Sequence, residues 1–192
     1  KLKLVDYVLV SIPPRMGKDI VLRKFRKTFT KLDLKKIIYL SATSVYGNHN
    51  GRWVDENSPL KGQTKLGRSR KKAEKLWFDF RKKNKLDINI IRVSGIYSKE
   101  NNVLQKIKKS KLYVKEKKFF SRIRVEDLAK IIKKVFFTKQ KNLVLNASDD
   151  KPSTNIEVAN YAAKLLKIKN IKAVPISEFK NKFIKDFYKD SK

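Results

Sequence analysis

Cysteine is absent from the 192-residue sequence, which excludes a disulfide framework and thiolate metal sites. Histidine is nearly absent: His49 stands alone in a polar segment, so we expect a solvated loop residue and no metal site. No apolar run reaches about 18 residues and the chain does not open on a leader-like segment, so neither a membrane span nor a secretion signal is predicted. We therefore expect a cytoplasmic protein.

Acidic residues are scarce: 18 Asp and Glu stand against 49 Lys and Arg, a formal net charge of +31. Such a charge would suit a polyanionic partner. Lysine supplies most of it along the whole chain, and aromatic residues do not alternate with the basic ones as in known nucleic-acid-binding patterns. Biased amino-acid usage is therefore the favoured explanation, and nucleic-acid binding stays open as an alternative.

Short apolar runs alternate with amphipathic stretches. Apolar runs that predict buried strands occupy residues 4–11, 37–40, 87–97 (a strand and its exit), 142–152 (a strand and its turn) and 171–174. Helical periodicity covers residues 19–32, 65–83, 126–136, 154–166 and 179–188, and Thr154 to Glu157 form a capping box. This order predicts an α/β fold with a doubly wound parallel sheet, because parallel neighbours need crossover connections.

The motifs lie near the middle of the chain. The run at 37–40 ends in the polar segment Ser41-Ala42-Thr43-Ser44-Val45-Tyr46-Gly47, and residues 66–74 then open a helix. Open parallel sheets bind ligands at the carboxyl ends of their strands. This strand, hydroxyl cluster, loop and helix resemble the active-site half of the extended short-chain dehydrogenase/reductases, the NAD-dependent epimerase/dehydratase family. Segments at 92–97, 122–129 and 146–152 resemble later motifs of that family in the same order.

The resemblance implies a Rossmann-type sheet with a small C-terminal α/β lobe on the substrate side. We expect one truncated domain, with residues 1–98 in the core and residues 99–192 divided between core and lobe. The implied cofactor is NAD or NADP, and the implied substrate is a small molecule such as a sugar nucleotide. The six glycines include no Gly-x-x-Gly-x-x-Gly phosphate loop, so we expect a fragment without its N-terminal strand and helix. The resemblance also allows a homodimer.

The catalytic positions of that family are altered. Its Ser or Thr, its Tyr and its Lys correspond to Ala42, Leu66 and Arg70. Alanine cannot donate a hydrogen bond, leucine cannot transfer a proton and arginine stays protonated. A subset of the family with a Gly-Arg-x-Arg helix start, like residues 67–70 here, resembles the chain more closely. The sequence therefore predicts a fold and a cofactor more clearly than a reaction.

Candidate site residues follow from the resemblance and from the hydroxyls. Thr43 and Ser41 could offer a hydroxyl to a substrate carbonyl, with Arg70 as an electrostatic contact. The expected cofactor contacts are Ser11, Ile12, Pro13, Ser41, Arg70 and Ile96. The expected substrate contacts are Arg122 and Trp53, although Trp53 could equally pin its loop to the core.

Three functions remain open. The first is an atypical oxidoreductase or epimerase, and the second is a non-catalytic NAD(P)-sensing regulator, suggested by the loss of all three usual groups. The third is nucleic-acid binding through the basic surface.

Overall fold

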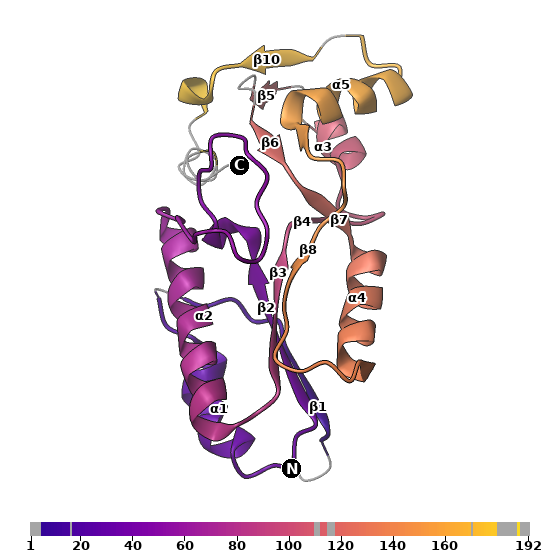
Figure 1. The fold of residues 1–192 in the computed structure, drawn as a ribbon. Coiled ribbons are helices and arrows are strands. Elements are labelled where there is room, and N and C mark those ends of the chain that lie inside the picture. The colour runs from indigo at the N-terminus through magenta and orange to yellow at the C-terminus, as the bar shows by residue number, and fades with distance from the viewer. Residues whose placement is uncertain are drawn as a thin grey trace.

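The computed structural model describes residues 5–15, 17–109, 112–114, 118–169, 171–179 and 188. Its main sheet has four parallel strands in the order β1–β2–β3–β8, formed by Tyr7–Val10, Lys36–Ala42, Ile88–Val93 and Val144–Ala147. The layers are helices α1 (Ile20–Phe29) and α2 (Lys65–Asn84) on one face and α4 (Val125–Phe137) on the other (Figure 1). The predicted doubly wound, Rossmann-type α/β fold is confirmed.

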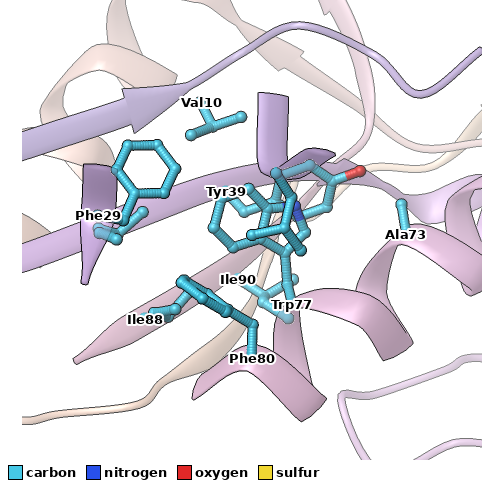
Figure 2. Packing of buried hydrophobic residues seen from close by; sticks show 10 residues of the cluster. Val10, Phe29, Tyr39, Ala73, Trp77, Phe80, Ile88 and Ile90 are labelled. Carbon is cyan, nitrogen blue, oxygen red and sulfur yellow. The ribbon is translucent and has the colours of Figure 1, made fainter. Parts of the chain in front are cut away.

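Both faces of the sheet are buried, which explains why its inner strands are almost continuously apolar. On the α1/α2 face, Trp77 of α2 stacks on Tyr39 of β2 with ring centroids 5.4 Å apart, and Phe29 of α1 packs beside them (Figure 2). On the opposite face, Ile38 of β2 packs in a cluster with Val135 of α4. Alternate residues of one strand therefore belong to different cores.

The helices begin where the sequence supplies caps. Asp19 accepts a hydrogen bond from the Leu22 amide at 2.7 Å at the start of α1, and Thr64 accepts one from the Gly67 amide at 3.1 Å at the start of α2. Thr154 and Glu157 form the predicted capping box of α5 (Asn155–Leu165). The predicted helices over 19–32, 65–83, 126–136 and 154–166 are therefore confirmed, with ends that differ by a few residues.

A smaller lobe sits at the carboxyl-end side of the sheet (Figure 1). It contains α3 (Val103–Lys109), β5 (Leu112–Val114), β6 (Phe119–Phe120), β9 (Ser153–Thr154), α5 and β10 (Lys172–Val174). β6 pairs antiparallel with β9, and β10 pairs parallel with β5. The chain enters the lobe after β3 and returns to the main sheet for α4 and β8. It then enters the lobe a second time.

The segment 87–97, predicted as a strand and its exit, contributes to two sheets. The chain leaves the main sheet at Ser94, and β4 (Gly95–Tyr97) pairs instead with β7 (Arg122–Arg124). The cause is long-range, because the Gly95 amide donates to the Ser121 carbonyl at 3.2 Å. Most of the helix predicted over 179–188 lies outside the described residues.

Candidate functional site

A cavity of about 440 Å³ lies between the carboxyl end of the sheet and the lobe. Its wall comes from the 3₁₀ turn η1 (Thr43–Val45), the loop of residues 47–63, β6 and the segment that follows β8. The polar and aromatic groups on this wall are Thr43, Tyr46, Arg52, Trp53, Phe119, Ser121, Asn146, Ser148 and Asp149. Apolar walls with a few polar groups are typical of small-molecule sites.

Two of the predicted residues line this cavity. Thr43 begins η1 directly after β2. Trp53 is 77% exposed and lies on the cavity wall, so it does not pin its loop to the core. An indole at this place can stack on a planar or sugar ring that enters the cavity.

Other predicted residues lie on the α2 face of the sheet. Ser41 follows Tyr39 at the two-residue spacing of a strand, so both side chains belong to this face. Arg70, on the second turn of α2, donates from Nη1 to the Leu40 carbonyl at 2.9 Å. Burial raises the pKa of Tyr39 to about 12, and the charge of Arg70 opposes that rise.

Buried hydroxyls without partners lie at this end of the sheet. Ser41 Oγ, Ser94 Oγ and Tyr39 Oη have no hydrogen-bond partner among the described residues, although the three side chains are nine-tenths or more buried. Buried hydroxyls are normally satisfied, because burial without a partner costs roughly 1 to 3 kcal/mol. They therefore offer hydrogen bonds to water or to a ligand.

The segment after β1 is held beside the start of α2. Ser11, Ile12 and Pro13 are exposed, and the amide of Gly17 donates to Ser69 Oγ at 3.1 Å. Because Ser69 precedes Arg70, these cofactor candidates share one edge of the sheet. Ile96, 48% exposed on β4, lies beyond the end of β3.

A buried network that the sequence did not reveal fixes the cavity wall. Arg92 of β3 donates through Nη2 to Glu74 of α2 at 3.0 Å and through Nη1 to the Tyr46 hydroxyl at 2.9 Å. That hydroxyl donates to Asn146 Oδ1 at 2.6 Å. The loop joins through Glu56, whose carbonyl accepts from Arg92 at 3.0 Å and whose carboxylate accepts from the Asn146 amide at 2.6 Å.

Charge balance stabilises this network. Burial alone would lower the pKa of Arg92, but Glu74 and Tyr46 outweigh that effect and raise it. Burial raises the pKa of Tyr46, against its hydrogen bonds with Arg92 and Asn146. The Tyr46 phenol is therefore neutral, and it joins the charged Arg92 side chain to the neutral Asn146 side chain. The Val-Tyr-Gly motif indicated the place but not these partners.

Arg122 is not brought to the cavity wall. Its Nη1 donates to the carbonyls of Phe120 and Ser153 at 2.8 and 3.0 Å, and its Nη2 donates to Asn155 Oδ1 at 2.9 Å. Burial lowers the pKa of this guanidinium. The side chain thus joins β7 to β6, β9 and α5, and its substrate role remains a prediction.

His49 contacts its own loop and a neighbouring aromatic ring. His49 Nε2 lies 3.0 Å from the Pro59 carbonyl, and the ring packs edge-on against Tyr46. In the part of the chain that the structure describes, no group of three His, Cys, Asp or Glu side chains could hold a metal ion. Among the same residues, no helix combines the length and apolarity that crossing a membrane requires.

Comparison with known proteins identifies a relative. No protein-family model matches the sequence, and no curated protein is similar to it. A solved structure does match: a functionally unknown conserved protein from Silicibacter pomeroyi is 30% identical, with a TM-score of 0.91, over 100% of this chain and 68% of that one. The chain belongs to the family of that conserved protein.

More distant solved structures have the same fold. The dTDP-glucose 4,6-dehydratase from Bacillus anthracis, in complex with NAD, is 19% identical with a TM-score of 0.72, over 88% of this chain and 60% of that one. The UDP-glucuronic acid 4-epimerase from Bacillus cereus, in complex with NAD, is 17% identical with a TM-score of 0.78, over 91% of this chain and 64% of that one. The chain thus spans less than two thirds of either protein, and at these identities the likeness concerns the fold alone.

Proposed function

We propose that the protein binds NAD or NADP and acts in the cytoplasm on a sugar nucleotide or a similar carbonyl or hydroxyl compound. One observation carries this proposal: unpartnered hydroxyls and a cavity both lie at the carboxyl end of one parallel sheet. Unpartnered Ser41 and Ser94 hydroxyls lie on the α2 side, and the 440 Å³ cavity opens toward the lobe. Open α/β sheets bind their ligands there, and the dehydratase and epimerase of the same fold were solved with NAD.

The α2 side fits a dinucleotide. A guanidinium has five N–H donors, so the bond from Arg70 to the Leu40 carbonyl leaves it able to hold a phosphate or a ribose. Ser41 supplies an unpartnered hydroxyl, and Ile12 and Ile96, 55% and 48% exposed, supply apolar contact to rings. When bound, the nicotinamide supplies hydride transfer.

The lobe side fits the substrate. Thr43 presents a hydroxyl to the cavity, where it binds and orients a carbonyl or hydroxyl group. Trp53 covers a ring, and Ser121, Asn146 and Asp149 offer hydrogen bonds. Arg122 holds β6, β9 and α5 in place beside this cavity, and its contact with the substrate stays a prediction.

A non-catalytic NAD(P) sensor is the second candidate, favoured by a specific observation. Leu66, at the position of the usual tyrosine, is 47% exposed and cannot transfer a proton. Ala42 offers no hydroxyl at the end of β2. An enzyme built this way moves protons through Thr43 or water and turns over slowly, whereas a sensor needs cofactor binding alone.

Calorimetric titration of NADH and NADPH into the full-length protein, with its phosphate loop present, tests cofactor binding. Arg70→Ala should weaken the affinity at least 10-fold, because a charge-assisted hydrogen bond to a ligand is worth about 1.5 to 3 kcal/mol. Arg68→Ala is the matched control: it removes an exposed arginine two residues earlier on the same helix, whose Nη1 donates to the Gln63 carbonyl. Absence of binding by the folded wild type would contradict both candidates.

A substrate panel separates the two candidates. UDP- and dTDP-sugars are added to the protein saturated with cofactor, and the nicotinamide absorbance is followed. A change that Thr43→Val abolishes without weakening cofactor binding supports the enzyme. Constant absorbance across the panel, with cofactor bound, supports the sensor.

A further inference from the structure

The positive charge is distributed unequally over the two faces of the sheet. Helices α1 and α2, which share one face, together carry 13 Lys and Arg residues and two acidic residues. Helices α4 and α5 carry four Lys and three acidic residues. A general bias toward lysine would charge all the helices alike, so usage alone does not account for this difference.

On α2 the cations form one line. Lys65, Arg68, Lys72, Lys75 and Lys82 are all exposed and follow one another three, four or seven residues apart, which places them on a single helix face. We call these five residues the α2 stripe. Asp79 is the acidic member of that face, and Lys75 binds it at 2.9 Å.

Helix α1 extends the charged surface beside the stripe. Its exposed side chains include Arg23, Lys24, Arg26 and Lys27, and the helix has no acidic residue. α1 and α2 lie next to each other over the same face of the sheet (Figure 1). The two helices therefore present one broad cationic face.

We propose that this α1/α2 face binds the phosphate backbone of a nucleic-acid duplex. Helix α2 has 20 residues, hence a length of about 30 Å, close to the roughly 34 Å of one duplex turn. A row of cations along that length can neutralise successive phosphates without reading the bases.

The composition of the face favours a duplex over other polyanions. Leu66 and Leu76 are the only exposed large apolar residues of the two helices, which leaves too little apolar surface for insertion into a membrane interface. No aromatic residue of these helices is exposed, so the face lacks a stacking platform for single strands. Two copies of the face would repel each other.

Fluorescence anisotropy with a labelled DNA duplex of about 20 base pairs tests the proposal, with the full chain and a salt series. The stripe variant replaces Lys65, Arg68, Lys72 and Lys75 by Gln, which preserves helix propensity. The control variant replaces Lys130, Lys133, Lys134 and Lys164 by Gln, and so removes the same charge from exposed positions of α4 and α5. Circular dichroism verifies that both variants fold.

The proposal predicts binding at about 0.1 M salt that the stripe variant weakens at least 10-fold. For the stripe variant, the slope of log affinity against log salt concentration should be smaller in magnitude by roughly 3 to 4, because each lost phosphate contact removes about 0.9. The control should change the affinity less than 3-fold. Equal losses in both variants, no duplex binding, or preferential binding to phosphatidylserine vesicles would each overturn the proposal.

Discussion

Lys36 is buried at the start of β2. Its ammonium group donates hydrogen bonds to backbone carbonyls at the end of α4, about one hundred residues later in the chain. Its Nζ donates to the carbonyls of Val135, Thr138 and Gln140 at 3.0, 2.7 and 3.0 Å and lies 3.5 Å from Asp87 Oδ2. The last carbonyls of a helix have no partner within it. The ammonium group therefore ties α4 to the sheet.

Lys36→Met should destabilise the protein by roughly 3 to 5 kcal/mol, because it leaves buried carbonyls and the carboxylate of Asp87 without their cation. Lys35→Met is the matched control, since it removes an exposed lysine whose partner, Asp6, is also exposed. That change should leave the stability almost unchanged, because exposed ion pairs contribute little. Urea unfolding measures both, and similar losses would contradict the role of Lys36.

Tyr39 makes stability depend on alkaline pH. Its pKa is raised to about 12 by burial from an ordinary value of 10.0. A raised pKa means that the neutral phenol favours the folded state: this contribution is complete below pH 10 and is lost as the pH rises to about 12.

Tyr39→Phe removes this titration together with an unpartnered hydroxyl. At pH 7 the variant should be at least as stable as the wild type, because the hydroxyl that it removes is buried without a hydrogen-bond partner. Between pH 10 and about 12 the wild type should lose roughly 2 to 3 kcal/mol more than the variant. Denaturant unfolding over that range measures the difference, and parallel curves would contradict the burial of the phenol.

Sequence reasoning at the residue scale found the hydroxyls but not the buried charges. Ser41 and Thr43 were predicted because they follow an apolar run. Lys36 and Arg92 look like solvated residues in the sequence, since their partners are many positions away and lysine and arginine are seldom buried. Only the tertiary fold shows that each has buried partners.

At the scale of elements, the loop of residues 47–63 is attached to the sheet by one charged network. Arg92 reaches both Glu74 of α2 and the carbonyl of Glu56 in the loop. The loop also returns to η1 through hydrogen bonds from the amides of Lys61 and Gly62 to the carbonyls of Tyr46 and Val45 at 2.9 Å. The cavity wall that carries Trp53 depends on this attachment.

Arg92→Met should release the loop and cost roughly 3 to 5 kcal/mol, because Glu74 is then buried without a cation. The double variant Arg92→Met, Glu74→Met should recover part of this loss, since it leaves no buried charge. Trypsin cleavage after exposed Arg52 reports loop release and should be faster in both variants than in the wild type. If Arg92→Met alone resists trypsin as well as the wild type does, the attachment of the loop through Arg92 is contradicted.

The helices and central strands could be predicted because their periodicity and caps are local. The strand pairing outside the main sheet could not be predicted in this way. β4 pairs with β7, about 27 positions further along the chain, and the sequence gives no turn or repeat that would fix this register. The break at Ser94 coincides with that pairing, and Gly95 directly follows it.

At the scale of the whole molecule, the sheet separates two surfaces of different character. The carboxyl ends of its strands meet the lobe around the cavity, and the α1/α2 face carries the cations. The residues proposed for cofactor binding and those proposed for duplex binding therefore differ, apart from the start of α2. Substitutions outside that shared segment are expected to affect one proposed property without the other.

The central claim is that NAD(P) binds at the carboxyl ends of β1 and β2 beside the start of α2. Hydrogen–deuterium exchange of the full chain, with and without saturating NADH, tests it most directly. The account predicts slower exchange in residues 11–17, 41–45, 66–71 and 94–97, with the outer turns of α4 unchanged. Exchange unaffected by NADH, or slowed only in other segments, would contradict the claim.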